Sequence, residues 1–361
     1  MAGFDGIKWA SRQSCYLLKD KSFKVVASND KVYAVSRSIH YGLFLAFEGI
    51  RFYCKKNSRG KVEIIFLNLG KNLLRFQKGI AFNLGQHQQQ WVPGIDDMAD
   101  IFLRYMRDAA MIEFLYEIAE QQAQGYLRPF TVDEEHSIGV TFPNNPSIRA
   151  VACRYDRYLG EPFSGVVVPN YVRACAANGT GCLKLGINYV ISLKAVDAAK
   201  KIFPGAAAAL LLDDRSFEAI EKRKITEWDS SCCLFALRDG TVIKIPESPL
   251  ILPSVTIQGI VAILKHQGVK VIERDMTYGE LVEKSKNNEV VAVCSVGTAG
   301  ILNRAQQLIL VDGSGKIIGE QQAEKNHELY QKLGEARNYY WDIYKEKVEV
   351  PPGLTLTKYE V

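Results

Sequence analysis

Most residue patterns that mark a catalytic site are absent from this sequence of 361 residues. It has no GxSxG turn, no HExxH zinc motif, no Walker A loop, and no GxGxxG loop after a predicted strand. The five histidines also lack the spacing of metal ligands. Asp133-Glu134-Glu135-His136 carries metal-binding side chains, but four consecutive residues cannot all point to one centre from a strand or a helix. We interpret this run as a solvated loop and expect no metal.

A lysine between glycines offers a different chemistry. The string Gly179-Thr-Gly-Cys-Leu-Lys184-Leu-Gly-Ile-Asn-Tyr189 resembles the lysine region of the branched-chain aminotransferases, which are class IV, fold-type IV pyridoxal-phosphate (PLP) enzymes. Other blocks similar to this family's motifs occur in order along the chain: His40-Tyr41-Gly42 with Phe47-Glu48-Gly49-Ile50-Arg51, Gly125-Tyr126-Leu127-Arg128-Pro129, Ile225-Thr226-Glu227, Leu252-Pro253-Ser254-Val255-Thr256 and Gly297-Thr298-Ala299. Each block is weak by itself, but chance does not explain their shared order.

The resemblance implies three catalytic residues. Lys184 would bind PLP covalently and move a proton between the substrate Cα and the cofactor, which requires an amine with a lowered pKa. Glu227 would pair with the pyridine nitrogen and keep the ring protonated, so that the ring accepts electrons. Tyr189 would donate a hydrogen bond to the phenolic O3′ of PLP.

The resemblance also implies three sources of donors for the PLP phosphate. Val255 and Thr256 begin a predicted helix, whose unpaired N–H groups and dipole favour an anion. Gly297 and Thr298 form a second loop, and Arg75 offers a guanidinium that can bind phosphate with two N–H groups. The residues expected to line the substrate pocket are Tyr41, Phe47, Arg128, Thr298 and Ala299.

The chain departs from the family's pattern near the expected substrate pocket. It has one extra residue before Phe47, Ile187 in place of a second glycine, and Ile257 in place of the usual arginine. Trp228 follows Glu227 in a run that is one residue longer than usual. Its indole would either pack behind the cofactor or form a wall of the side-chain pocket. The resemblance makes branched-chain substrates the first choice, and these departures weaken that assignment and keep a specialised biosynthetic substrate as the second.

The resemblance implies a PLP-dependent aminotransferase that acts between an amino acid and a 2-oxo acid such as 2-oxoglutarate. It also implies a homodimer. Two alternatives stay open: an aminodeoxychorismate-lyase-type PLP enzyme and a non-catalytic member of the same fold. Yellow colour in the purified protein would argue against the second alternative, and half-transamination by glutamate would argue against the lyase.

Composition narrows the class of protein further. Hydrophobic residues make up 47% and charged residues 24%, which is typical of soluble globular chains. The net charge of 45 − 40 = +5 is spread along the chain, so nucleic acid is not an expected partner. We find neither an N-terminal signal peptide nor an apolar run long enough for a membrane span. Eight scattered cysteines without a CxxC pair indicate reduced thiols, and we expect a cytoplasmic protein.

The elements that must hold these residues fall into two predicted domains. Residues 1–153 would form a smaller α+β domain, with strands at 22–27, 32–35 and 62–68 before a helical stretch at 95–122. Residues 154–164, with mixed charges, Gly and Pro, would form a linker. Residues 165–361 would form a larger PLP-binding domain with helices at 255–266 and 328–347. The predicted fold class is α+β / α/β, and the resemblance implies the two-domain fold of the D-amino acid aminotransferase-like, fold-type IV PLP enzymes.

Overall fold

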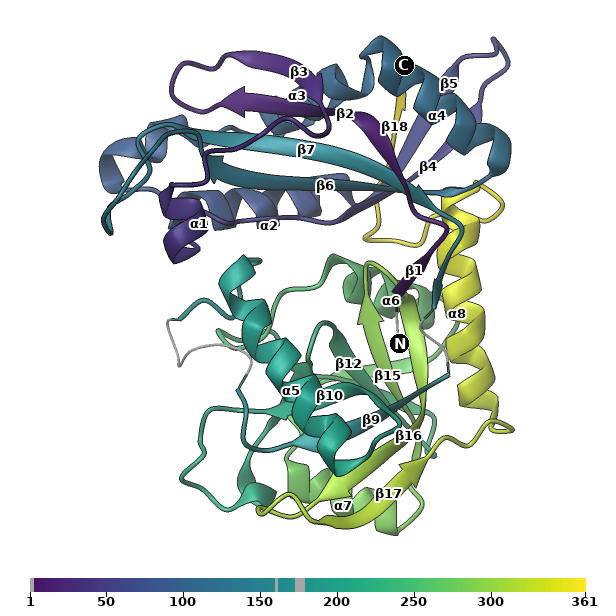
Figure 1. Cartoon of the computed structure of the whole chain (residues 1–361). Coiled ribbons are helices and arrows are strands. Elements are labelled where there is room, and N and C mark those ends of the chain that lie inside the picture. The colour runs from purple at the N-terminus through teal and green to yellow at the C-terminus, as the bar shows by residue number, and fades with distance from the viewer. Residues whose placement is uncertain (1–2, 160–161, 173–178) are drawn as a thin grey trace. The chain divides into compact units, whose positions relative to one another are not determined.

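The computed structural model describes residues 3–159, 162–172 and 179–361 (Figure 1). The chain forms two compact units. The smaller unit contains residues 4–157, 183–187 and 355–361, and the larger unit contains Gly3 and the other described residues of 158–354. The passage between units at 157–158 lies inside the predicted linker of 154–164. Further passages, on both sides of 183–187 and at 354–355, are not anticipated by the sequence.

The smaller unit is built on a seven-stranded antiparallel sheet with the order β18-β5-β4-β6-β7-β2-β3. Its strands are β2 (Lys8–Leu17), β3 (Phe23–Ala27), β4 (Ile50–Lys56), β5 (Val62–Leu67), β6 (Gln124–Asp133), β7 (Pro146–Tyr155) and β18 (Leu356–Glu360). The short strands β1 (Gly3–Asp5) and β8 (Arg157–Leu159) pair separately. The strand predicted at 32–35 is wrong, because this segment has no partner strand and three of its four residues are exposed.

Helices pack on this sheet through apolar stripes. They are α1 (Arg37–Tyr41), α2 (Leu69–Phe82), the 3-10 helix η1 (Gln86–Trp91), α3 (Ile95–Met106) and α4 (Ala109–Gln121). In α3, Met98, Ile101, Phe102 and Tyr105 are spaced three or four residues apart and are buried in one core with residues of β4 and β5. The single helical stretch predicted at 95–122 is two helices, because Asp108 caps α4 by accepting from the N–H of Ala110 at 3.1 Å.

The larger unit contains a nine-stranded mixed sheet. Eight strands follow the order β11-β10-β9-β16-β15-β12-β13-β14, and β17 pairs with β16. They are β9 (Phe163–Val168), β10 (Ala206–Leu212), β11 (Ile225–Trp228), β12 (Cys232–Leu237), β13 (Thr241–Lys244), β14 (Lys270–Glu273), β15 (Val290–Gly297), β16 (Ile301–Val311) and β17 (Ile317–Gln322). Because β9 pairs in parallel with both β10 and β16, its Val166, Val167 and Val168 are buried.

Helices cover this sheet. They are α5 (Tyr189–Ile202), α6 (Val255–His266), α7 (Tyr278–Lys286) and α8 (Glu328–Tyr344), with the 3-10 helices η2 (Gly186–Asn188) and η3 (Ile220–Lys222). Helix α5 packs on β9 and β10, whereas α6 and α8 pack on each other and on β15 and β16 (Figure 1). Helix α6 has the predicted bounds, and α8 ends three residues before the predicted end.

Two general findings concern the described residues. None of the helices in this part of the chain is long and apolar enough to cross a membrane. The seven cysteines for which the structure gives positions form no disulfide with one another. Cys175 lies outside the described residues.

Candidate functional site

Lys184 belongs to the smaller unit, where the segment Leu183–Ile187 adds to its fold. The Lys184 carbonyl accepts from the N–H of Phe47 at 3.0 Å, and Leu185 forms an antiparallel bridge with Ala46. The Lys184 ammonium lies 4.9 Å from the centre of the Phe47 ring. The backbone thus fixes the predicted catalytic lysine beside Phe47, which is one of the predicted substrate residues.

Helix α2 brings Arg75 to the same unit. Gly79, one turn after Arg75, lets the helix approach closely, since a Cβ there would lie 3.1 Å from the Cβ of Ala46 and 3.8 Å from Leu185. Arg75 is 8% exposed and donates from Nε to Glu48 at 2.7 Å and from Nη2 at 2.5 Å. The predicted phosphate-binding arginine is therefore held by a buried carboxylate to which sequence analysis assigned no role.

The Glu48 carboxylate is fully buried and remains ionised. Burial alone would raise its pKa, but the charge and hydrogen bonds of Arg75, followed by the charge of Lys184, hold the pKa of Glu48 below its ordinary value. The N–H of Gly49 donates to the same carboxylate at 2.7 Å. Glu48 therefore connects Arg75 electrostatically to the predicted catalytic lysine.

Arg128 lies beside the Phe47 ring as well. Its guanidinium carbon is 4.8 Å from the centre of that ring and 5.2 Å from the centre of the Tyr126 ring, and its Nη2 donates to the Tyr126 hydroxyl at 2.8 Å. Arg128 and Tyr126 are two residues apart on β6 and so share a face. Gly49 makes room for this hydroxyl, since a Cβ there would lie 1.9 Å from it. The smaller unit thus brings together Phe47, Arg128 and Lys184.

Tyr41 ends α1, and its side chain is 42% exposed. Two hydrogen bonds hold α1 to the end of β6 and the segment after it: Ser137 accepts from the N–H of Arg37 at 2.8 Å, and Ser38 accepts from the N–H of Asp133 at 2.9 Å. An ion pair between Arg37 and Asp133 at 2.9 Å strengthens this attachment. These contacts set the position of the helix that carries Tyr41.

The prediction that Asp133 to His136 form a solvated loop is wrong for the first two residues. Asp133 is the last residue of β6 and is fully buried against Arg37, and burial raises its pKa. The Glu134 side chain is 10% exposed and pairs with Arg149, which donates from Nε at 2.5 Å and from Nη2 at 2.9 Å. Only His136 is exposed. The described residues contain no group of three or more His, Cys, Asp or Glu side chains that could hold a metal ion.

In the larger unit, Glu227 lies on β11 and is 1% exposed. Its Oε1 accepts from the N–H of Leu252 at 3.4 Å, and the Cys232 thiol lies 4.0 Å from its Oε2. Arg223 fixes the start of this strand, because it donates to the carbonyls of Pro169 at 2.7 Å and of Asp213. Glu227 thus enters the interior on a strand anchored at its start.

Tyr189 begins α5 in the larger unit and is partly buried. The preceding residue, Asn188, donates to the Thr180 carbonyl at 2.8 Å and accepts from the Thr180 hydroxyl at 2.5 Å. These bonds tie the glycine-rich turn at 179–182 to the start of α5. The Asn-Tyr pair of the sequence motif therefore has a structural role at its asparagine.

The predicted phosphate donors also lie in the larger unit. Val255 and Thr256 are the first two residues of α6, and the Ser254 hydroxyl caps this helix by accepting from the N–H of Ile257 at 3.2 Å. Gly297 ends β15, and Thr298 and Ala299 lie in the turn before β16, where Ile301 has a positive φ of 63°. Val255 and Thr256 thus begin a helix, and Gly297 and Thr298 lie where a strand ends and a loop begins, as the sequence predicted for their backbone.

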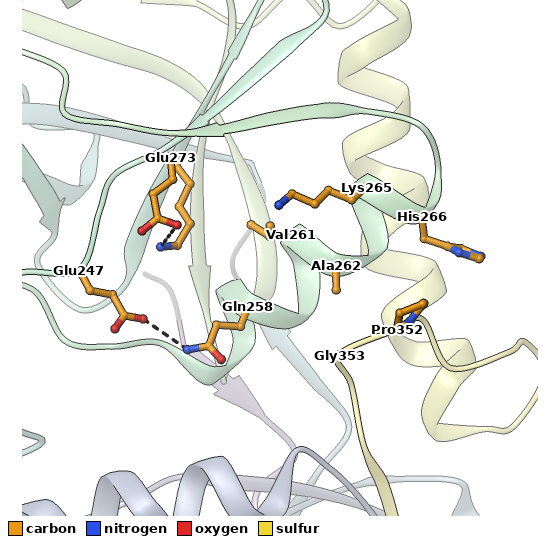
Figure 2. A pocket seen from close by; sticks show the side chains of 10 residues that line it. Glu247, Gln258, Val261, Ala262, Lys265, His266, Glu273, Pro352 and Gly353 are labelled. Carbon is orange, nitrogen blue, oxygen red and sulfur yellow. Dashed lines mark hydrogen bonds and ion pairs between the residues drawn. The ribbon is translucent and has the colours of Figure 1, made fainter.

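A large cavity of the larger unit lies elsewhere. It has a volume of about 690 Å³, and none of the predicted site residues lines it. Figure 2 shows two of its polar contacts, from Gln258 to Glu247 at 3.3 Å and from Lys244 to Glu273 at 3.1 Å. Its ten lining residues are Lys244, Glu247, Gln258, Val261, Ala262, Lys265, His266, Glu273, Pro352 and Gly353.

Comparisons with known proteins agree with the motif blocks, although no family model matches the chain. The branched-chain-amino-acid aminotransferase 2 of Bacillus subtilis is 26% identical over 294 residues, which are 81% of this chain and 75% of that protein. The branched-chain-amino-acid transaminase 1 of the same organism is 25% identical over 89% of this chain and 83% of its own length.

Solved structures share the fold. The branched-chain aminotransferase of Thermoproteus uzoniensis with norvaline superposes with a TM-score of 0.68 at 19% identity, over 96% of this chain and 99% of that one. The Escherichia coli branched-chain amino acid aminotransferase gives a TM-score of 0.65 at 18% identity, over 95% and 98%. The chain is similar to branched-chain aminotransferases over most of its length and shares their two-domain, fold-type IV architecture. The predicted resemblance and the predicted two-domain fold class are confirmed.

Trp228 is the departure from the branched-chain aminotransferases that the structure explains best. Its indole is 1% exposed, donates to the Cys294 carbonyl at 3.0 Å, and meets the Phe163 ring edge-on at 5.5 Å. Gly165 leaves room for it, since a Cβ there would lie 2.4 Å from the indole. Because consecutive strand residues point to opposite faces, Trp228 faces away from Glu227. Trp228 is therefore a packed core side chain on the opposite face of β11 from Glu227, and whether it lies behind the cofactor stays a prediction.

The two isoleucine departures differ in their surroundings. Ile257 is 2% exposed and belongs to the buried face of α6. Ile187 is 58% exposed. An arginine at position 257 could not keep its charge in that apolar setting without a partner, so the substitution fits the local packing.

Sequence analysis missed two residues that support the site. Glu48 belongs to the motif block Phe47-Glu48-Gly49-Ile50-Arg51, and the hint that the sequence offered was an acidic residue in a largely apolar stretch. Asn188 belongs to the lysine block, and an asparagine is a residue type that often precedes the first turn of a helix. The partners of both residues lie elsewhere in the chain, and the pattern alone does not name them.

Proposed function

We propose that the protein is a PLP-dependent aminotransferase that moves an amino group between an amino acid and a 2-oxo acid. The observation that carries this proposal is Lys184, which is half-buried and fixed beside Phe47 in a unit that also holds the Glu48–Arg75 ion pair. The similarity to branched-chain aminotransferases over most of the chain supports it.

The residues present fit PLP. Glu227 is a buried carboxylate suited to a ring N–H, and Tyr189 offers a phenol for O3′. Val255 and Thr256 at the start of α6, together with Gly297, Thr298 and Arg75, would hold the phosphate. When bound, PLP supplies a ring that accepts electrons from the substrate Cα.

The chain's own residues would bind, orient and move a proton. The Lys184 amine would take the proton from the substrate Cα and pass it to the cofactor, and it would carry the proton back in the reverse half-reaction. Glu227 would stay ionised and keep the proton on the ring nitrogen. Tyr41, Phe47, Arg128, Thr298 and Ala299 would orient the substrate.

We propose that branched-chain amino acids are the first substrate class, with glutamate and 2-oxoglutarate as the other pair. The names of the relatives support this choice. The burial of Trp228 supports it too, because a buried indole removes no volume on the Glu227 side. A specialised biosynthetic substrate is the second candidate, since the departures at Ile187 and Ile257 remain.

A screen of amino donors with 2-oxoglutarate tests this function. We expect glutamate to form with leucine, isoleucine or valine, and glutamate alone to convert the yellow protein to its amino form. Failure of every donor, together with a colourless protein in excess PLP, would contradict the proposed function. Activity with other donors only would overturn the substrate class and leave the reaction type intact.

We also propose a homodimer, with an apolar surface of the smaller unit as part of its interface. Phe82, Val140 and Phe142 are 52%, 75% and 53% exposed and line a cavity of about 570 Å³ with Leu43 and Phe44. Exposed apolar clusters of this kind mark interaction surfaces. Light scattering should give twice the monomer mass, and Phe142→Ser should shift the mass toward the monomer. Phe217→Ser, at an 84% exposed position of the larger unit, serves as the control. The cytoplasmic location stays a prediction.

A further inference from the structure

The segment that carries Lys184 is closed at its base by two hydrogen bonds between Thr180 and Asn188, which we call the clasp. The Thr180 hydroxyl donates to Oδ1 of Asn188 at 2.5 Å, and Nδ2 of Asn188 donates to the Thr180 carbonyl at 2.8 Å. Because a carbonyl can only accept, it fixes which end of the amide faces which group of Thr180. Asn188 is 4% exposed and Thr180 is half-buried, so the clasp is largely shielded from water.

Lys184 lies at the midpoint of this segment, four residues after Thr180 and four before Asn188. Thr180 and Asn188 belong to the larger unit, whereas residues 183–187 between them belong to the smaller unit. A short segment whose ends are joined has fewer conformations than one whose ends are independent. The clasp therefore limits where the chain can carry the lysine.

Backbone hydrogen bonds hold the middle of the segment. The Lys184 carbonyl accepts from the N–H of Phe47, and the N–H of Gly186 donates to the Leu45 carbonyl, each at 3.0 Å. These bonds set the backbone of Lys184 but do not involve its amine. The direction of the side chain depends on the backbone torsions of the segment, which the clasp restrains from both ends.

We propose that Thr180 is a positioning residue for Lys184: with Asn188 it closes the segment so that the amine is held where it attacks the aldehyde carbon of PLP. In this step the neutral amine adds to the aldehyde, a C=N double bond forms, and the aldehyde oxygen leaves as water with the two amine protons. The inference rests on the proposed function, because it takes PLP as the group that reacts. It deepens that function by adding a residue that acts through the segment and not through the cofactor.

Two forms of the cofactor separate positioning from binding in the full-length protein freed of cofactor. PLP binds and then reacts with Lys184, whereas pyridoxamine 5′-phosphate has no aldehyde and only binds. At saturating PLP, we expect Thr180→Val to form the covalent product about tenfold to a hundredfold more slowly, because a misplacement of about 1 Å can cost about a hundredfold. The dissociation constant of pyridoxamine 5′-phosphate should stay within about threefold of the wild type, since the variant leaves the proposed ring and phosphate contacts in place. Stopped-flow absorbance follows the covalent step, and borohydride reduction with peptide mass spectrometry locates the product on Lys184.

Thr180→Ser and Thr277→Val are the matched variants. Serine keeps the hydroxyl that donates to Asn188, so we expect Thr180→Ser to react with PLP at a rate close to that of the wild type. Thr277 is another half-buried threonine of the larger unit that bonds at a helix start, where its hydroxyl accepts from the N–H of Glu280 at 3.2 Å. Thr277→Val therefore reports the general effect of losing such a hydroxyl, and its rate with PLP should match the wild type.

Several outcomes would overturn the proposal. If Thr180→Val weakens the binding of pyridoxamine 5′-phosphate as much as it slows the reaction with PLP, the clasp only maintains the fold. An unchanged rate in Thr180→Val, or a rate in Thr180→Ser as low as in Thr180→Val, would also overturn it. If Thr180→Val does not fold, Thr180→Ala undergoes the same comparison and decides. A wild-type protein that binds neither compound, or that forms no covalent product with PLP, would contradict the proposed function instead, so the two failures are distinguishable.

Discussion

The two units hold their buried polar groups in different ways. In the smaller unit, buried charges pair with one another across long stretches of sequence, as in Glu48–Arg75, Asp133–Arg37 and Glu134–Arg149. In the larger unit, Arg223 and Asp213 also form a buried ion pair, at 3.6 Å, but several other buried polar side chains bond the backbone. Glu227 accepts from the N–H of Leu252, Asp229 from the N–H of Ala209, and Trp228 donates to the Cys294 carbonyl.

The difference suggests a division of labour at the proposed site. A buried ion pair is costly to break, because one charge is left without compensation. The smaller unit should therefore respond most to changes of charge. A side chain that bonds the backbone is sensitive to strand register and shape, so the larger unit should respond most to changes of packing. We expect Glu227 to be an exception in the larger unit and to be sensitive to a change of charge, because its carboxylate would keep the proton on the PLP ring nitrogen.

Lys184→Ala has the largest expected effect. The variant should lose the visible absorption of lysine-bound PLP and all transamination, because a methyl group cannot form the covalent bond. Its circular dichroism should match the wild type. The hydrogen bond between Lys184 and Phe47 and the bridge between Leu185 and Ala46 are made by backbone atoms, which the substitution leaves in place. Lys286→Ala, at an exposed position of α7, is the control. Near-normal turnover by Lys184→Ala would refute the catalytic assignment.

Glu227→Gln should lower the transamination rate by several orders of magnitude while the variant still binds PLP. An amide is uncharged and cannot hold the proton on the ring nitrogen, although its oxygen can still accept from Leu252. Steady-state kinetics and a PLP titration separate the two effects, with Glu221→Gln at an exposed position as the control. Weak PLP binding with normal turnover at saturating PLP would mean that Glu227 has a structural role. Glu227 would then no longer be an exception among the buried polar residues of the larger unit.

The same contrast explains what sequence analysis could find. The helix 255–266 was predicted with its bounds, because its signals are local: the Ser254 cap and the turn at Gly268 stand at its ends. The burial of Asp133 could not be predicted, because its partner Arg37 lies on a separate helix far along the chain. A run of charged residues has the same composition whether it forms a solvated loop or buried ion pairs, so composition does not distinguish the two.

Long-range returns of the chain escaped prediction for a similar reason. Leu183–Ile187 and Thr355–Val361 belong to the smaller unit, although each directly follows a stretch of the larger unit in the sequence. Their strand pairing with Ala46 and with β5 depends on backbone partners, and no side-chain pattern encodes those partners. The motif residues themselves were placed by resemblance, and their roles as site residues stay predictions.

Trp228→Ala tests whether packing dominates the larger unit. Truncation of a buried Trp typically costs about 3–5 kcal/mol of unfolding free energy. Urea unfolding should show a loss of that size, whereas Trp9→Ala at a 53% exposed position should show far less. The ratio of kcat/KM for a leucine-derived 2-oxo acid to that for pyruvate should not change. A shift of this ratio with little loss of stability would restore Trp228 as a pocket wall.

Tyr278→Phe has the smallest expected effect and adds a pH test of backbone bonding in the larger unit. The Tyr278 hydroxyl donates to the Val311 carbonyl at 2.7 Å and accepts from the Val311 N–H at 2.8 Å, and burial raises the pKa of Tyr278 to about 12. Loss of both bonds should lower the unfolding free energy by about 1–3 kcal/mol at neutral pH.

The pH dependence of stability gives a second test. The unfolded chain releases the Tyr278 hydroxyl proton near pH 10, but the folded protein releases it only near pH 12. The wild type therefore loses stability as the pH rises between these values, by at most about 1.4 kcal/mol per pH unit. The phenylalanine variant lacks this proton, and the gap between the two proteins should therefore narrow from about pH 9 to about pH 11. Urea unfolding at both pH values measures the gap, with Tyr33→Phe at a 43% exposed position as the control. A gap that stays constant would mean that Tyr278 ionises equally in the folded and unfolded protein and that its backbone bonds do not hold its proton.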